Sequence, residues 1–426
     1  MHNLSFIKIL FALSCQFLFF YLSADSACSQ ATGALSYELK GHTGKVNFAA
    51  FSSDGKKVVT ASDDKTAQLW DAESGEKLQK LEGHTGEVNS AVFSPDGKKI
   101  VTASWDHTAR IWDTESGKEL KKFRGCDNIT TYIARTPMVA IGGTEPLKSI
   151  RFASFSPDGT QIVVALDLTI RILDTESGEE QKWLYGHSPG VSKSGRAPSY
   201  SIGSVAYSSD GKKIVSAGLG DGTVKVWDAV SGKKLHTTSY SLGSVHFVAF
   251  SPDDKRIVSS LSDCIFLWDA DLKSVLYKFC RYKDRYKDVD FYWFREPVYS
   301  ATFSPDGREL VVAARDNARI GTTPDGKPIM GGEGMTPRIV DVESGTVLLK
   351  LEGHTDQVLY AVFSPDGKKI VTASTDNTAR IWDVTCCPYP ANVRCPCPRQ
   401  SIQPEAETGA NHLGVSESDE KSNRKD

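Results

Sequence analysis

One repeated signature constrains the fold of this chain more than any other feature. Each copy carries a Ser-Pro-Asp-Gly turn or a close variant, and a closing Asp follows the turn Asp by 17 residues in the clearest copies. The clearest copy contains Gly83-His84, Ser94-Pro95-Asp96-Gly97, Thr102, Asp106 and Trp112-Asp113. A later copy, from Gly353-His354 to Trp382-Asp383, nearly duplicates it. A strand-rich unit that recurs at a period near 42 residues predicts a repeat architecture.

The signature occurs seven times. The turn aspartates are Asp54, Asp96, Asp158, Asp210, Asp253, Asp306 and Asp366, and the closing aspartates are Asp71, Asp113, Asp174, Asp228, Asp269, Asp341 and Asp383. Alternating segments predict four strands in each unit, at 88–94, 99–104, 109–112 and 119–123 in the second. Gly97 is expected to take the left-handed conformation that ends the first turn. Four antiparallel strands cannot bury both faces alone, so we expect the sheets to stack radially.

The expected fold is therefore all-β: a seven-bladed β-propeller of four-stranded antiparallel blades over residues 34–385. The repeats resemble the WD-repeat family over roughly residues 35–384. In that family a His, a Ser or Thr, an Asp and a Trp form a hydrogen-bonded chain within a blade. The resemblance implies three structural tetrads: His42, Thr60, Asp64, Trp70; His84, Thr102, Asp106, Trp112; and His354, Thr372, Asp376, Trp382.

The resemblance also predicts how the ring closes. Residues 34–39 form a spare strand ahead of the first unit, whereas no fourth strand follows Val384 in the last unit. In WD-repeat proteins the N-terminal strand commonly completes the last blade. Other units depart from the pattern: Leu173 replaces Trp in the third, and the fourth keeps Ser216, Asp221 and Trp227.

Extra length is confined to a few connections. The long segments are 125–147, 186–201 and 280–297, which precede a first strand, and 320–337, which separates a second strand from a third. Both positions fall on one face of the ring, and loops on a rigid scaffold commonly carry recognition. The third segment combines aromatic residues with arginine, as interface hot spots do; its candidate protein-binding residues are Arg281, Tyr282, Arg285, Tyr286, Tyr292, Trp293 and Phe294. The alternative is that residues 291–294 fold inward and cap the ring.

The N-terminal residues 1–27 have the layout of a signal peptide. Lys8 precedes an apolar run, and small residues follow it, so we expect export to the periplasm, the medium or the cell surface. An uncleaved anchor is the alternative, and it is the one case in which we expect membrane association. Export favours disulfides, for which the candidates are Cys264, Cys280, Cys386, Cys387, Cys395 and Cys397. Residues 386–426 are predicted to be a Cys/Pro-rich stretch followed by a disordered polar tail.

These patterns favour binding over catalysis. The formal net charge is −3 with no basic stripe, so we expect no nucleic-acid partner. The Gly186–Gly190 match to a nucleophile elbow is interpreted as a Gly-His repeat marker. We expect a monomeric, non-catalytic scaffold for other proteins, without catalytic residues, cofactor or metal. The alternative is a propeller enzyme or small-ligand-binding protein with a site at the mouth of the central channel.

Overall fold

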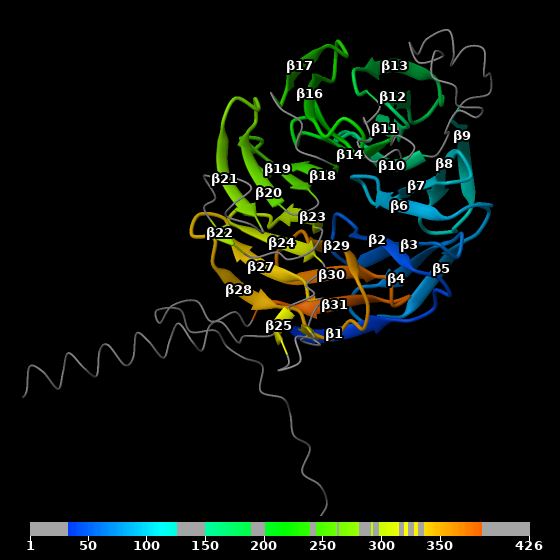
Figure 1. The fold of residues 1–426 in the computed structure, drawn as a ribbon. Helices are drawn as coiled ribbons and strands as arrows, with labels where there is room; N and C mark the ends of the chain where they lie inside the picture. The colour runs from blue at the N-terminus through cyan, green and yellow to red at the C-terminus, as the bar shows by residue number, and fades with distance from the viewer. Residues whose placement is uncertain are drawn as a thin grey trace, which may run out of the picture.

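The strands of this protein form sheets that are buried on both faces. In β3 (Lys57–Ser62), Val58 and Val59 point to opposite faces, and neither is exposed. Val58 packs with the sheet on one side and Val59 with the sheet on the other. Such strands are stable only between two neighbouring sheets, and the computed structural model shows this arrangement as a ring of seven blades (Figure 1).

The structure describes residues 33–125, 150–188, 201–238, 244–261, 264–280, 291–292, 298–314, 319–322, 328–330 and 336–385. Within these residues the chain is all-β and contains no helix. No helix in this part of the chain is therefore long and apolar enough to cross a membrane.

Each blade is a meander whose first strand lines the central channel and whose fourth strand lies at the outer edge. The first three blades contain β2 (Val46–Phe51), β3, β4 (Ala67–Asp71) and β5 (Lys77–Leu81); β6 (Val88–Phe93), β7 (Lys99–Ser104), β8 (Thr108–Asp113) and β9 (Glu119–Arg124); and β10 (Ile150–Phe155), β11 (Gln161–Leu166), β12 (Thr169–Asp174) and β13 (Glu180–Tyr185). The strands predicted for the second unit are thereby confirmed, with ends that differ by one residue.

The remaining blades follow the same order. They contain β14 (Ile202–Tyr207), β15 (Lys213–Gly218), β16 (Val224–Asp228) and β17 (Lys234–Thr237); β18 (Val245–Phe250), β19 (Arg256–Leu261), β20 (Cys264–Asp269) and β21 (Val275–Cys280); β23 (Val298–Phe303), β24 (Glu309–Ala314), β27 (Arg338–Asp341) and β28 (Val347–Lys350); and β29 (Val358–Phe363), β30 (Lys369–Ser374), β31 (Ala379–Asp383) and β1 (Ala34–Leu39).

The N-terminal strand closes the ring, as predicted. β1 pairs antiparallel with β31, from Ala34 opposite Asp383 to Leu39 opposite Ala379, and the two strands lie side by side in Figure 1. Arg380 Nη2 donates to Glu38 Oε1 across this pair at 3.0 Å. The last blade is thus built from both ends of the propeller sequence, which joins its first and last repeats.

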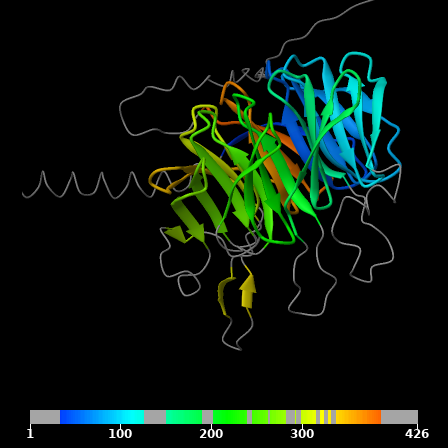
Figure 2. The ribbon, with the colours of Figure 1, turned by 90° about the horizontal axis from the view of Figure 1, so that it is seen from above.

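The two faces of the ring differ. One, here called the turn face, carries the short Ser-Pro-Asp-Gly turns; Gly97 has the expected positive φ of 70°, and its N–H donates to the Ser94 carbonyl at 2.8 Å. The opposite insertion face carries the connections between blades and the turns between second and third strands. A hairpin of β25 (Arg319–Thr322) and β26 (Pro328–Met330), which the sequence did not predict, extends from this face in the sixth blade (Figure 2).

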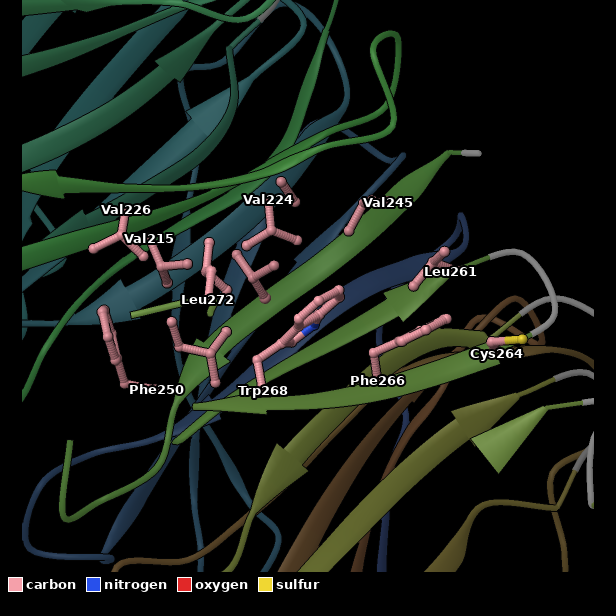
Figure 3. Packing of buried hydrophobic residues seen from close by; sticks show 13 residues of the cluster. Val215, Val224, Val226, Val245, Phe250, Leu261, Cys264, Phe266, Trp268 and Leu272 are labelled. Carbon is pink, nitrogen blue, oxygen red and sulfur yellow. The ribbon is translucent and has the colours of Figure 1, made fainter. Parts of the chain in front are cut away.

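Apolar clusters join the blades in pairs. The described residues form seven such clusters, and each combines strands of two adjacent blades. Figure 3 shows one of them, in which Val215 and Val224 of the fourth blade face Leu261 and Trp268 of the fifth. Burial of this kind stabilises a fold by roughly 25 cal/mol per Å² of apolar surface. The blades therefore hold one another in place around the whole ring.

The backbone of β22 (Phe291–Tyr292) corrects one expectation about residues 280–297, here called the Arg/aromatic segment. It pairs with Phe279 and Cys280 of β21, in parallel, and so adds a fifth strand to the outer edge of the fifth blade. For these two residues, the alternative in which the stretch folds inward to cap the ring is wrong. Edge pairing satisfies backbone groups of β21 that would otherwise lack a strand partner.

Candidate functional site

The predicted tetrads come together as hydrogen-bonded chains inside the blades. In the first blade Trp70 Nε1 donates to Thr60 Oγ1 at 2.9 Å, and Thr60 Oγ1 lies 2.7 Å from His42 Nε2. His42 Nδ1 donates to the Asp64 carboxylate at 2.8 Å, because a carboxylate can only accept. The second and seventh blades repeat this chain with His84 and His354, at distances between 2.7 and 2.9 Å.

A fourth tetrad, which the sequence analysis recognised only in part, lies in the fourth blade. His187 Nε2 lies 2.8 Å from Ser216 Oγ, which also accepts from Trp227 Nε1 at 2.9 Å. His187 Nδ1 contacts Asp221 at 3.0 Å, and Lys225 Nζ donates to the same carboxylate at 3.0 Å. The Gly186-His187 marker was the available signal, but a long segment separates it from Ser216.

Burial and hydrogen bonding fix the charge states of these chains. Burial lowers the pKa of His84, His187 and His354, although the aspartate beside each acts in the opposite direction. For Asp106, burial alone would raise the pKa, but the hydrogen bonds from His84 and Thr108 outweigh it and hold the pKa well below its usual range. In the blades of His84, His187 and His354 the lowered pKa values favour a carboxylate acceptor and a neutral imidazole, which suits an imidazole that donates at Nδ1 and accepts at Nε2.

The tetrads are closed to solvent. The four imidazole side chains are at most 1% exposed, and the four carboxylates at most 8%. Each His lies in a connection between blades and each Asp in a turn between second and third strands, so the chain ties two segments of the insertion face together. Because no substrate could reach these imidazoles without unfolding the blade, the geometry fits a structural role.

A layer of aromatic rings divides the central channel. The third residues of the inner strands lie at one level of the ring, and in blade order they are Phe48, Ser90, Phe152, Ser204, Phe247, Ser300 and Tyr360. Phe48 lies 5.6 Å from Phe152 and 4.0 Å from Tyr360 between ring centroids, and Phe247 lies 5.6 Å from Tyr360. Among the described residues, this aromatic layer is what closes the channel.

The alternation of large and small residues makes this layer fit. Four rings fill the channel because serines occupy the positions between them, and only Tyr360 and Phe48 are adjacent, since seven is odd. Each serine hydroxyl accepts the N–H of an inner-strand residue in the next blade: Ser90 from Ala153, Ser204 from Val248 and Ser300 from Ala361, at 2.9 to 3.3 Å. The serines thus satisfy backbone donors of the neighbouring inner strands.

The described residues line two hollows in the channel, one on each side of the aromatic layer. The hollow on the turn face has a volume of about 530 Å³ and is lined mainly by apolar side chains such as Ala50, Val92 and Ala249. The hollow on the insertion face, here called the mouth hollow, has a volume of about 220 Å³ and a polar lining that includes Asn47, Arg151 and His246. Both contact Phe48, Phe152, Phe247 and Tyr360.

The remaining predicted site residues are placed as follows. Arg281, Tyr282, Arg285, Tyr286, Trp293 and Phe294 lie outside the described residues, as do Cys386, Cys387, Cys395 and Cys397. The backbone of Tyr292 lies in β22. Cys264 is disulfide-bonded, and the residue opposite it in the register of β20 and β21 is Cys280. No group of three or more His, Cys, Asp or Glu side chains in the described ranges could hold a metal ion.

Comparison with known proteins follows the structural divisions of the ring. The WD domain, G-beta repeat family matches residues 33–71, 75–113, 181–228, 232–269 and 345–383. Each match runs from an outermost strand to the third strand of the next blade. The two stretches without a match are those that lead into the third and sixth blades, where Leu173 and Val340 stand in place of the tryptophan.

Three curated relatives illustrate the likeness. The chain is 27% identical to the nuclear distribution protein PAC1 of Arthroderma benhamiae over 363 residues, which cover 85% of this chain and 63% of the relative. It is 24% identical to the serine-threonine kinase receptor-associated protein of Gallus gallus over 347 residues, or 81% and 68%. It is 25% identical to the apoptotic protease-activating factor 1 of Danio rerio over 254 residues, or 55% of this chain but only 18% of the relative.

Proposed function

This chain belongs to the WD-repeat family, and from that premise we propose that it is a non-catalytic scaffold that binds other proteins through its insertion face. WD-repeat propellers generally bind other proteins, and the relatives are regulatory or scaffold proteins of this family. The observation that carries the proposal is the placement of chain length. The segments that exceed the repeat all begin and end on the insertion face, whereas the turn face keeps short turns.

The ring that presents this face is held from several directions. Seven apolar clusters join the blades, β1 latches the last blade to the first, and four tetrads tie connections to turns on the insertion face itself. Loops on such a frame lose little conformational freedom on binding, which favours affinity. The aromatic layer also closes the channel beneath this face, so a partner contacts a closed surface rather than an open pore.

The described part of the insertion face carries residues suited to an interface. Trp105 is 45% exposed in the turn after β7, and Arg151 lies beside it at 5.5 Å from the ring centroid. Tyr299 is half-buried at the edge of the mouth hollow. Trp, Tyr and Arg are the residue types that dominate protein-binding hot spots.

A pull-down with the full chain tests the proposal. Wild type and a variant whose residues 281–294 are replaced by a Gly/Ser linker serve as baits for the native host's exported proteins. A second variant, Arg308→Ala with Lys368→Ala, alters exposed charges on the turn face and is the matched control. We expect a specific partner with wild type and the control but not with the linker variant. Equal recovery by all three baits would move recognition away from this segment, and enrichment of a small molecule instead would favour the ligand-binding alternative.

We also propose that the protein is exported. The apolar run with its flanking Lys8 and small residues supports this, and the disulfide of Cys264 is of the kind that persists in oxidising compartments. Mass spectrometry of the N-terminus after cell fractionation tests it. A mature chain that begins near residue 28 in the soluble exported fraction is expected; the full sequence in the membrane fraction would indicate an uncleaved anchor, and the full sequence in the cytosol would contradict export.

A further inference from the structure

The mouth hollow is lined by equivalent residues from all seven blades. The second residue of each inner strand reaches this level of the channel, and in blade order these residues are Asn47, Asn89, Arg151, Gly203, His246, Tyr299 and Leu359. Most of them are polar, in contrast to the aromatic layer immediately below. Seven strands thus converge on one small polar cavity at the centre of the insertion face.

Most polar groups of this ring already have partners. Asn47 Nδ2 donates to Asp63 Oδ1 at 2.7 Å and to the Val88 carbonyl at 3.0 Å. Asn89 Nδ2 donates to the Ile150 carbonyl at 2.9 Å, and the Tyr299 hydroxyl bonds Gln357 Oε1 at 2.9 Å. The amides are therefore positioned by the protein itself and stiffen the wall of the hollow.

Arg151 differs from its neighbours. Its Nε is buried and has no hydrogen-bond partner in the described part of the chain. Burial lowers the pKa of Arg151, and the charge of Asp167 opposes this through space only. A guanidinium has five N–H donors and remains charged, so leaving one of them buried and unbonded is costly. The described residues thus supply no acceptor to this nitrogen of the arginine in the wall of the mouth hollow.

Gly203 adds no side chain to this ring. It stands between Arg151 and His246 in the ring, on β14 of the fourth blade. A Cβ at this position would lie 2.5 Å from the carbonyl oxygen of His246 and 2.9 Å from that of Val245, so the close approach of β18 requires glycine. The ring of side chains is consequently interrupted next to Arg151.

We propose that the mouth hollow anchors an acidic segment of a protein partner, with one carboxylate of that segment bound to Arg151 and the adjoining residue packed on the exposed ring of Trp105. The inference rests on the proposed scaffold function and names the chemistry of its partner. A volume of about 220 Å³ accommodates one side chain rather than a folded element. Guanidinium and carboxylate match in geometry and form paired hydrogen bonds, and the adjacent indole supplies an apolar contact that a free anion would not need.

Fluorescence anisotropy with labelled hexaglutamate tests this anchor, and labelled hexaglutamine is the matched neutral probe. We expect the full-length protein to bind hexaglutamate in preference to hexaglutamine. Arg151→Gln should weaken hexaglutamate binding at least about tenfold, since it removes a charged donor of the site. Arg308→Gln, an exposed arginine on the turn face, should leave binding unchanged.

A second variant distinguishes loss of the binding site from misfolding of Arg151→Gln. Trp105→Ala changes an exposed side chain, so its unfolding midpoint should equal that of wild type while hexaglutamate binding weakens a few-fold. Binding that is insensitive to both substitutions would overturn the proposal. Displacement by inorganic phosphate at stoichiometric concentration, with Trp105→Ala without effect, would assign the hollow to a free anion and also overturn it.

The two proposals fail in distinguishable ways. Loss of the partner from the linker variant, together with hexaglutamate binding that ignores Arg151, would retain the scaffold function and reject the acidic anchor. If no bait recovers a protein although hexaglutamate binding depends on Arg151 and Trp105, the anchor chemistry stands and the scaffold function through residues 281–294 fails.

Discussion

The ring contains a regular arc of blades seven, one and two, and a variable arc of blades three to six. Every blade of the regular arc has a complete tetrad, and its connections are short. Among the described residues of the variable arc only the fourth blade has one, and all the extra chain length is found in this arc. Since a tetrad ties a connection to a turn on the insertion face, its loss frees that face to change. The regular arc thus keeps the ring closed, and the variable arc carries the loops that distinguish the surface of this chain.

The apolar clusters explain how the variable arc remains folded without the tetrads. Leu173 and Val340 replace the tryptophan in the third and sixth blades and are 4% and 1% exposed. Both belong to inter-blade clusters that are as continuous as those of the regular arc. The fifth blade keeps part of the chain, in which Trp268 Nε1 donates to Ser259 Oγ at 2.9 Å. Packing between blades therefore carries the fold, and the tetrads add local order.

Substitution in the closing strand should have the largest effect, because it breaks the regular arc. Leu39 on β1 is not exposed, so Leu39→Asp buries an unpaired charge and should lower the free energy of unfolding by about 4 kcal/mol or more. Leu35→Asp on the same strand is the control, since Leu35 is 46% exposed. Urea denaturation compares the two, and equal stability would mean that β1 does not close the ring.

Removal of a tetrad tryptophan should have the next largest effect. Trp112→Leu gives the second blade the residue that the third has at Leu173, and it should lower the free energy of unfolding by about 3 kcal/mol through a cavity and a lost donor to Thr102. Trp105→Leu in the same blade is the control, because this tryptophan is 45% exposed. Similar losses of unfolding free energy in both variants would show that the tetrad does not stabilise the blade.

Reduction should destabilise the variable arc through the disulfide of Cys264. A disulfide of Cys264 constrains the fifth blade, and dithiothreitol should lower the unfolding free energy of wild type by about 2 kcal/mol. In the Cys264→Ala variant, dithiothreitol should cause little of this loss in unfolding free energy. If that variant responds to the reductant as wild type does, the effect comes from other cysteines of the chain.

Acidification should have the smallest effect on stability, because it acts through protonation of the histidine in each tetrad. Burial lowers the pKa of His84 from its ordinary 6.5, so between pH 7 and 5 the unfolded chain binds a proton that the folded chain does not. Stability should therefore fall as the pH falls through 6.5, by at most about 1.4 kcal/mol per pH unit for each such histidine. The aspartates, whose pKa is also lowered, add a second loss below pH 4.

The effect of a single tetrad is measured from the slope of stability against pH. His84→Gln should show a shallower dependence between pH 7 and 5 than wild type, whereas His236→Gln, a half-buried histidine of the outer strand β17, should not. A stability that stays constant from pH 7 to 5 in wild type would show that the buried imidazoles take up protons without loss.

The tetrads were predictable to the extent that their spacing was regular. His84, Thr102, Asp106 and Trp112 lie within one uninterrupted unit, so the repeat identifies all four. His187 is separated from Ser216 by an insertion, and it could be assigned to its tetrad only when the structure brought the two within 2.8 Å. The β25–β26 hairpin was missed because its two short strands follow no repeat pattern.

The repeat, the number of blades and the strand segments within a unit could be predicted from turn chemistry and from a period that recurs along the chain, and the closing strand was predicted from the family resemblance. How the channel is filled and which residues line its mouth depend on the tertiary structure. Phe48, Phe152, Phe247 and Tyr360 come from distant repeats, as do Arg151, Gly203 and His246. They occupy equivalent positions of the inner strands, but they become neighbours only when the ring closes.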